Sequence, residues 1–475
     1  MSALTPDGRP VDEVLAALEA QREGDVNWRT GKVLSGLYDP GGEASDLAGE
    51  AYRRFLTENA LYVNFYPSIN RMEKEVVRAV ADLVQGGQLV TGNVTSGGTE
   101  SIILAVKTAR DWARAHRPAV GEPEMVLPVS AHPAFHKAAH YLGVRPIVTP
   151  MDLSTFRADV AAVRGAVSGR TILVVGSAPT YSHGVVDPIP EMAAIAVEAG
   201  SFMHVDGCVG AIPLGLMRLL GEAVPAFDMS VAGVTTLSAD LHKYGYAPKN
   251  ASVLLYRDAE VRRFAWFVNS STTEYAVINP TVQSSRTGGP VAAAWALFQH
   301  LGQAGYMEMT RRVLATTRAM VEGVAGIEGV AVLGEPDMTM FTLASDTVNV
   351  FELDDAMRRR GWSLLPEFAA GGGPANLHVA VSASNVGRER EFIDDLTSSV
   401  AEIRAHPRVD RDALAAAISD VAEATPLEVF AALAPLVGLT GMELPEDMAA
   451  LNTAMDMLPA GLRDELLTDF ANLMW

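Results

Sequence analysis

The chain has 475 residues, more than one ordinary core holds, so we expect a large domain plus a smaller one. Its formal net charge of -20 argues against nucleic acid and anionic membranes as partners, because both bind basic surfaces. The one cysteine, Cys208, excludes internal disulfides and fits a reducing compartment. Without a signal-like start or an apolar run of roughly 18 residues, we expect a cytoplasmic protein with no membrane anchor.

Strand-like and helical runs alternate from about residue 60 to residue 260. The expected strands are 125–129, 146–149, 171–176, 202–205 and 252–256. This alternation predicts an α/β fold with a doubly wound, mainly parallel sheet. We therefore expect an N-terminal helical segment over 1–60 and a large domain over 61–289.

The pattern changes near residue 288. A long helix over 290–301 precedes shorter strands at 338–343 and 377–381, with helices between them. This arrangement predicts a smaller C-terminal α/β domain over 290–408.

From residue 409 to residue 475 the chain is acidic and alanine-rich, with helical patterns broken by Pro426, Pro435 and Pro445. We expect a helical tail that caps and stabilises the fold. A tail that covers the mouth of a site or a partner subunit is the alternative.

Two polar motifs follow apolar runs, His204-Val-Asp206 and Ser238-Ala-Asp-Leu-His-Lys243. The runs place Asp206 and Lys243 at strand ends, where open α/β sheets build their sites. Such a lysine is a candidate Schiff-base nucleophile, and the upstream aspartate is a candidate partner for a pyridinium nitrogen. Taken singly, the lysine could be a solvated charge and the aspartate a helix or turn cap, so the prediction depends on accompanying motifs.

Two further motifs precede helical runs. In Asn93-Val-Thr-Ser-Gly-Gly-Thr-Glu100, Gly97 and Gly98 let the backbone approach an anion, and Thr99 can donate a hydroxyl. The free amides of the new helix favour a phosphate there, although an ordinary helix cap uses the same residues. His132 lies in the turn after an expected strand, where an imidazole can stack on a flat ring or simply hydrogen-bond the turn.

These motifs, in this order, resemble those of the pyridoxal-phosphate-dependent group II decarboxylases, and within them the sphingosine-1-phosphate lyases. The strongest match runs from Leu237 to Lys249. Further matches are Gly31–Tyr38, Val94–Ser101, His204–Cys208, Ser252–Arg257 and Ser285–Gly289. The resemblance covers about residues 30 to 305 and implies a fold-type I enzyme that is active as a homodimer, similar to the soluble bacterial lyases.

The resemblance also implies the cofactor, pyridoxal 5'-phosphate, and no metal. It implies that Lys243 carries the cofactor and that Asp206 keeps the ring nitrogen protonated. The other implied contacts are His132 and Cys208 at the two faces of the ring, and Gly97, Gly98, Thr99, His242 and, from the neighbouring subunit, Ser285 at the phosphate.

Three residues match lyase positions that bind the substrate's own phosphate or assist proton transfer near it: Tyr38, Tyr181 and Lys249. A lysine ammonium is a point charge suited to a phosphate. The alternatives are an exposed loop lysine and two packing aromatics.

The chain departs from the lyase pattern at two places where substrate should enter, Asn59-Ala-Leu-Tyr62 and Ser271–Tyr275. Tyr62 is a candidate substrate contact, and Glu274 is expected to repel a second anion. These departures leave a shorter phosphorylated amino alcohol or an amino acid open as substrate.

The sequence leaves three alternative functions to be tested. The first is a carbon–carbon lyase that acts on a phosphorylated sphingoid base and releases phosphoethanolamine and an aldehyde. The second is an L-amino-acid α-decarboxylase, and the third is a non-catalytic protein that binds the cofactor.

Overall fold

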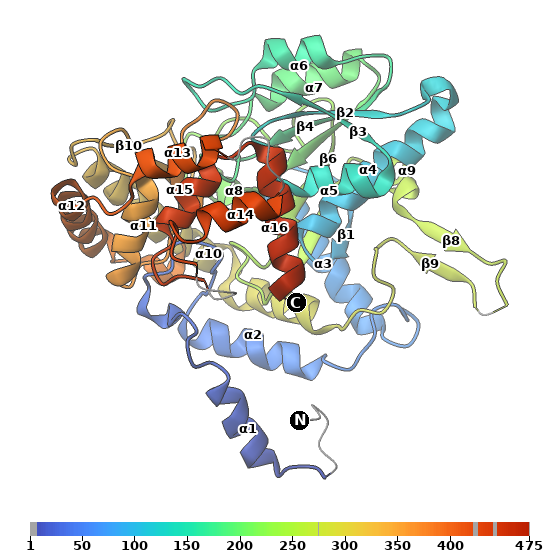
Figure 1. Ribbon diagram of the computed structural model, residues 1–475. Coiled ribbons are helices and arrows are strands. Elements are labelled where there is room, and N and C mark those ends of the chain that lie inside the picture. Colours follow the sequence, from blue (N-terminus) through green and yellow to red (C-terminus); the bar gives the residue numbers. More distant parts are fainter. Residues whose placement is uncertain (1–6, 274, 421–425, 440–443, 475) are drawn as a thin grey trace.

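A seven-stranded sheet forms the centre of the computed structural model, which describes residues 7–273, 275–420, 426–439 and 444–474 (Figure 1). The strand order is β1-β7-β6-β5-β4-β2-β3. The strands are β1 (Thr91–Thr95), β2 (Glu124–Pro128), β3 (Arg145–Thr149), β4 (Thr171–Ser177), β5 (Phe202–Asp206), β6 (Val234–Asp240) and β7 (Ser252–Tyr256). Only β7 runs antiparallel to its neighbours among these strands, which confirms the predicted doubly wound, mainly parallel sheet.

Helices cover both faces of this sheet. They are α3 (Pro67–Leu83), α4 (Gly98–His116), α5 (Ala134–Leu142), α6 (Val160–Ala166), α7 (Ile189–Glu198), α8 (Ala211–Leu219) and α9 (Ala259–Arg262), with short 3₁₀ helices η2 (Pro118–Val120) and η3 (Arg263–Ala265). Val174 belongs to the core under α7 and α8, whereas Val175 belongs to the core under α4 and α5. Since successive strand residues face opposite sides, a strand buried on both faces is mainly apolar, as β4 is between its polar end residues Thr171 and Ser177.

The small domain follows the large one and confirms the predicted second α/β unit. Its antiparallel sheet has the order β10-β11-β13-β12. Its elements are α10 (Gly289–Val324), β10 (Val330–Val332), β11 (Met340–Ser345), α11 (Val350–Arg359), β12 (Leu365–Glu367), β13 (Asn376–Ala380), η4 (Ala383–Asn385) and α12 (Glu389–Ala405). The predicted helix end at residue 301 coincides with Gly302, whose φ of 55° interrupts α10 before helix resumes.

The N-terminal segment contains α1 (Val11–Ala20), η1 (Trp28–Thr30) and α2 (Gly42–Arg54). No residue of α1 is buried, and the helix stands off the body in Figure 1. A hairpin of β8 (Phe267–Asn269) and β9 (Val277–Asn279) also projects from the body. None of the helices in the described ranges combines the length and apolar character needed to cross a membrane.

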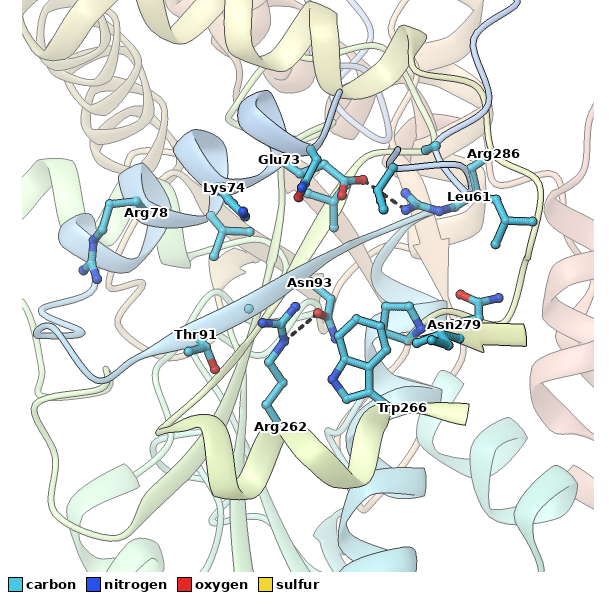
Figure 2. Close-up of a pocket in the computed structure, with 18 of the residues that line it drawn as sticks. Leu61, Glu73, Lys74, Arg78, Thr91, Asn93, Arg262, Trp266, Asn279 and Arg286 are labelled. Atoms are coloured by element: carbon cyan, nitrogen blue, oxygen red, sulfur yellow. Dashed lines mark hydrogen bonds and ion pairs between the residues drawn. The ribbon is translucent and has the colours of Figure 1, made fainter. Parts of the chain in front are cut away.

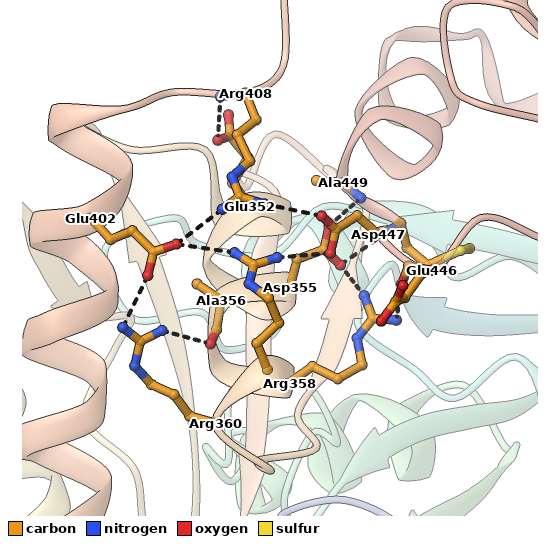
Figure 3. Close-up of polar contacts among 12 residues, drawn as sticks. Glu352, Asp355, Ala356, Arg358, Arg360, Glu402, Arg408, Glu446, Asp447 and Ala449 are labelled. Atoms are coloured by element: carbon orange, nitrogen blue, oxygen red, sulfur yellow. Dashed lines mark hydrogen bonds and ion pairs between the residues drawn. The ribbon is translucent and has the colours of Figure 1, made fainter. Parts of the chain in front are cut away.

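The described part of the tail contains the helices α13 (Arg411–Asp420), α14 (Pro426–Leu433), α15 (Ala449–Met457) and α16 (Ala460–Met474), around a small apolar core of its own. Asp355 of α11 accepts hydrogen bonds from the backbone N–H groups of Met448, at 3.0 Å, and Ala449, at 2.8 Å. Beside it lies a group of ion pairs that we call the tail clamp, formed by Arg359, Arg360, Glu402, Arg408 and Asp447 (Figure 3). The tail is therefore anchored on the small domain. The exact domain limits remain a prediction.

Candidate active site

A cavity of about 160 Å³ lies where strands of the large sheet end. Ser177, Asp206 and Asp240, the last residues of β4, β5 and β6, all line it. The rest of the lining is Gly98, Thr99, Ile102, His132, Pro179, Tyr181, Cys208, Val209, His242 and Lys243. Most residues predicted for the cofactor site are thus brought together from segments spread over about 150 residues of sequence.

Asp206 is held in a buried hydrogen-bond network. One carboxylate oxygen accepts from the Cys208 N–H at 3.0 Å and from the Ser238 hydroxyl at 3.2 Å. Burial alone would raise the pKa of Asp206, but the rings of His132 and His204 and the Cys208 contact lower it below its ordinary value. The carboxylate is therefore anionic at neutral pH.

His204, two residues before Asp206 on β5, lies next to this network. It has no role in our sequence predictions. Its Nδ1 lies 2.8 Å from the Thr236 hydroxyl, and burial lowers its pKa to about 4, so the ring is neutral. Its period-two position on the strand was the available signal, because it must face the same side as Asp206.

The Lys243 amine reaches the cavity and forms an ion pair with Asp240, whose Oδ2 lies 3.0 Å away. Burial alone would lower the pKa of Lys243, but the charge of Asp240 outweighs it and raises that pKa above its ordinary value. The Asp240 Oδ1 is buried and has no hydrogen-bond partner among the described residues. Asp240 belongs to a predicted motif but has no role in our sequence predictions. Its place three residues before Lys243 was the available signal of a contact with the lysine.

The predicted phosphate cradle opens α4. Gly97 has φ 144°, and a Cβ at Gly98 would approach Cys208 Sγ to 2.8 Å and Asp240 Oδ2 to 2.9 Å. Only glycine fits there, and the first turn of α4 presents N–H groups without intrahelical acceptors. Glu100 fixes the loop by accepting from the N–H groups of Ser96, at 2.5 Å, and Val282, at 2.6 Å.

The other cofactor candidates surround this cradle. The Nδ1 of His132 accepts from the Ala134 N–H at 3.1 Å, so the neutral ring carries its proton on Nε2. Removal from water lowers the pKa values of His132 and His242. Cys208 lies 3.2 Å from the Ser238 hydroxyl, and burial raises the pKa of its thiol, which keeps the thiol protonated.

The three residues predicted to contact the substrate's phosphate are placed differently, because Tyr38 and Lys249 do not line the cavity. Tyr181 lines it, and Tyr38 is close enough that Tyr181 and Asp240 both raise its pKa, after burial as the main cause. The Lys249 amine lies 5.3 Å from the centre of the Tyr38 ring and donates to the Gly36 carbonyl at 2.9 Å. Burial, and after it the charge of Lys243, lower the pKa of Lys249.

Two predicted site residues lie away from the cavity of their own chain. Tyr62 is 40% exposed and stacks on Phe65, and Ser285 is exposed and accepts from the Asn59 side chain at 3.2 Å. Neither residue lines the cavity. Glu274, expected to repel a second anion, lies outside the described residues.

A separate cavity of about 380 Å³ lies between α3, the free edge of β1 and residues 262–286 (Figure 2). Figure 2 shows Arg286 paired with Glu73, at 3.0 Å, and Arg262 donating to Asn93, at 2.9 Å. No predicted catalytic residue lines it. Within the described ranges, no group of three or more histidine, cysteine, aspartate or glutamate side chains could hold a metal ion.

Comparison with known proteins agrees with this geometry. Residues 26–343 match the model of the pyridoxal-dependent decarboxylase conserved domain, and residues 412–473 match that of the C-terminal putative HTH domain of pyridoxal-dependent enzymes. The sphingosine-1-phosphate lyase of Oryza sativa is 39% identical over 83% of this chain and 74% of its own length.

Two further relatives bear on the site. The structure of the sphingosine-1-phosphate lyase of Burkholderia pseudomallei superimposes with a TM-score of 0.81 and 36% identity, over 85% of this chain and 94% of the other. A probable L-aspartate decarboxylase of Pyrococcus abyssi is 32% identical over 77% of this chain and 92% of its own length.

The residues present fit pyridoxal phosphate. The cavity offers an amine at Lys243, an anionic carboxylate at Asp206 and a glycine-lined helix start that a Cβ would fill. An amine, a partner for the ring nitrogen and a phosphate cradle are what this cofactor requires. The chain therefore belongs to the pyridoxal-dependent decarboxylase family, and it is a lyase that uses pyridoxal phosphate.

Proposed function

We propose that this lyase cleaves a carbon–carbon bond in a phosphorylated sphingoid base, or in a similar phosphorylated amino alcohol, and releases phosphoethanolamine and an aldehyde. The observation that carries the proposal is the grouping of Tyr38, Tyr181 and Lys249 beside the cavity that holds Lys243. The names of the lyase relatives support the same substrate class.

Each residue of the cavity has a distinct task in this proposal. Lys243 binds the cofactor through its amine, and anionic Asp206 holds a proton on the ring nitrogen. When bound, pyridoxal phosphate accepts the electron pair released by cleavage at the substrate's α-carbon. His132 and Cys208 confine the ring from its two faces, while Gly97, Gly98, Thr99 and His242 hold the phosphate.

The choice of bond depends on how the substrate is oriented. Lys249, as a point charge, would bind the substrate's phosphate together with the hydroxyl of Tyr38, which is buried and has no hydrogen-bond partner among the described residues. Tyr181 would assist proton transfer at the reacting carbon atoms. A phosphate fixed in this way would orient the bond between the amine-bearing and hydroxyl-bearing carbons for retro-aldol cleavage, and such a substrate has no α-carboxylate to lose as carbon dioxide.

The second candidate is an L-amino-acid α-decarboxylase. The observation in its favour is that Lys249 could equally bind the side-chain carboxylate of an acidic amino acid, the substrate class named for the Pyrococcus abyssi relative. In that case carbon dioxide would be released instead of an aldehyde.

A product assay separates the candidates. The purified holoenzyme is incubated with sphingosine 1-phosphate and, separately, with a panel of L-amino acids, while aldehyde, phosphoethanolamine and carbon dioxide are measured. We expect equal amounts of aldehyde and phosphoethanolamine from the phosphorylated base. Carbon dioxide from an amino acid, with no aldehyde from the base, would make the protein a decarboxylase, and no turnover of either class would favour a non-catalytic role.

We also propose that the enzyme works as a cytoplasmic homodimer in which Ser285 contacts the cofactor phosphate of the partner subunit. Several projecting segments expose apolar side chains that a second copy would cover: Val11, Val14, Leu15 and Leu18 of α1, Phe267 and Val268 of β8, and Ile278 of β9. Apolar surface of this extent marks a protein interface. The cavity of Figure 2 borders the β8–β9 hairpin through Trp266 and Ile278.

Mixing two inactive variants tests the shared site. Lys243→Ala lacks its amine but keeps Ser285, whereas Ser285→Asp keeps Lys243 and places a negative charge beside the partner's phosphate. We expect each variant to be inactive alone and mixed dimers to regain one complete site. Sedimentation as a monomer, or no recovery in dimers shown to have exchanged subunits, would refute the shared site.

A further inference from the structure

Tyr181 lies on a tight turn of the large domain that the small domain holds from outside. The turn, Thr180–Val185, is closed by a hydrogen bond from the Thr180 N–H to the Val185 carbonyl, at 2.8 Å, and one from the Gly184 N–H to the Thr180 carbonyl, at 3.0 Å. We call it the Tyr181 turn. A Cβ at Gly184 would lie 2.3 Å from the Met340 carbonyl oxygen, so the turn packs directly on the backbone of β11.

Three strands of the small domain converge on Ser182, the next residue along. Its carbonyl accepts from the Thr342 hydroxyl of β11 and from Nδ1 of His378 on β13, the latter at 3.1 Å. Thr342 and His378 are directly paired in the sheet, so their side chains share one face. Glu367 of β12 also lies near Ser182: burial raises the pKa of Glu367 to about 6, and Ser182 lowers it in part.

His378 makes a second contact, with Tyr181 itself. The two ring centres are 4.2 Å apart and the rings are inclined by 31°. His378 is completely buried, and burial lowers its pKa to about 4, so the ring is neutral. Because a carbonyl can only accept, Nδ1 carries the proton, and Nε2 has no hydrogen-bond partner among the described residues.

We propose that His378 is a positioning residue for Tyr181, which it holds through the ring contact and through the Ser182 carbonyl. The proposal rests on the role given to Tyr181 in the proposed function. A histidine suits the task because one flat neutral ring supplies both a packing surface and a directed donor. Position 378 lies 196 residues after Ser182 in the sequence. The small domain thereby sets the geometry of a side chain of the large domain.

Two variants of His378 separate its two contacts. His378→Phe keeps a flat ring against Tyr181 but removes the donor to Ser182, whereas His378→Asn keeps a donor near the place of Nδ1. Phe341→Leu is the matched control, because Phe341 is fully buried on the same strand as Thr342 but faces the other side. Absorbance of the bound cofactor and thermal unfolding show whether each variant is folded and loaded.

The decisive readout is a double-mutant cycle with Tyr181→Phe. In the wild-type background, we expect His378→Phe to lower kcat roughly tenfold with KM nearly unchanged, and His378→Asn to recover most of that loss. In the Tyr181→Phe background, His378→Phe should have little further effect. Phe341→Leu should lower thermal stability and leave kcat nearly unchanged in both backgrounds.

Crystal structures of the holoenzyme and of His378→Phe provide a readout that does not depend on the reaction. We expect the Tyr181 turn to shift or to become less ordered in the variant. Equal kinetic losses in both Tyr181 backgrounds, or an unmoved Tyr181 turn, would overturn the positioning role. A wild-type enzyme that fails to cleave sphingosine 1-phosphate would instead refute the proposed function, and the crystal structures would then decide the positioning role alone.

Discussion

The catalytic cavity and the C-terminal tail are both bound to neighbouring elements by polar contacts, but of different kinds. Around the cavity, Asp206, Ser238 and His204 are buried and form hydrogen bonds of 2.8 to 3.2 Å. In the tail clamp of Figure 3, side-chain exposure runs from 26% at Arg360 to 53% at Arg408. Buried networks are strong and insensitive to salt, whereas exposed ion pairs contribute little and are screened. The contrast indicates that the geometry of the cavity is fixed, whereas the strength of the tail's ion pairs depends on salt.

Removal of the Lys243 amine should have the largest effect. We expect Lys243→Ala to lose the yellow absorbance of covalently bound cofactor and all measurable turnover. The reason is that Lys243 is the one lysine among the described residues that line the cavity. Absorbance spectra and borohydride reduction followed by peptide mapping check this. A reducible chromophore on another lysine would contradict the assignment.

Replacement of Asp206 tests the electrostatic part of the buried network. Asp206→Ala should fold but lose roughly a hundredfold or more in kcat, the loss typical of a missing electrostatic partner. Steady-state kinetics with saturating cofactor measure it, with Asp206→Asn as a variant of matched size. Near-normal turnover of either variant would remove Asp206 from the mechanism.

Lys249 and Tyr38 separate substrate recognition from cofactor binding. Lys249→Ala or Tyr38→Phe should weaken transition-state binding of a phosphorylated amine by about 1.5–3 kcal/mol, or roughly ten- to a hundredfold in kcat/KM. Cofactor affinity should not change, and decarboxylation of an amino acid with an uncharged side chain should be barely affected. Equal losses on both substrate classes would speak against a phosphate site.

Asp355, which lies beside the tail clamp and is buried, holds the start of α15. Asp355→Asn should weaken two charge-assisted hydrogen bonds to the start of α15 and raise hydrogen exchange over α15 and α16 by the equivalent of about 1–3 kcal/mol. Cofactor absorbance should stay as in wild type. Unchanged exchange in the tail would show that Asp355 does not anchor it.

Glu402 should have the smallest effect. Hydrogen bonding from Arg360, aided by the charges of Arg360 and Arg359, lowers the pKa of Glu402 in the folded protein. A lowered pKa contributes stability above the unfolded pKa of about 4.3, and that stability is lost as pH falls through the folded value. Glu402→Gln should therefore destabilise the tail by about 1 kcal/mol or less at neutral pH and have no effect at strongly acid pH or high salt. A difference from wild type that persists in high salt would contradict a screened ion pair.

Local pattern was sufficient to place several residues of the cavity, whereas their roles were predicted from the family resemblance. An apolar run that ends in a polar residue marks a strand end wherever it occurs, which is why Asp206 and Lys243 could be placed from the sequence. The same holds for the glycines before α4, whose conformation is a local property. The direction of a strand was not predictable in this way, because the mainly apolar sequence of β7 looks the same in a parallel and an antiparallel strand.

Contacts between distant parts of the fold could not be predicted from the sequence. His378 meets Tyr181 only because two domains pack together, and nothing near either residue indicates it. Ser285 was predicted to reach a partner's site, and its exposed place away from its own cavity leaves that prediction to the mixed-dimer experiment. The extension of α10 past Gly302 was missed because a glycine there resembles a helix end.

The central claim is that this enzyme recognises a phosphate on its substrate. It is tested most directly by kcat/KM of the wild-type holoenzyme for sphingosine 1-phosphate and for sphingosine, measured side by side through the aldehyde released. We predict that the phosphorylated base is preferred by roughly a hundredfold or more, as expected when a charge-assisted site loses its ligand group. Equal values for the two bases, or aldehyde from neither while an amino acid releases carbon dioxide, would contradict the claim.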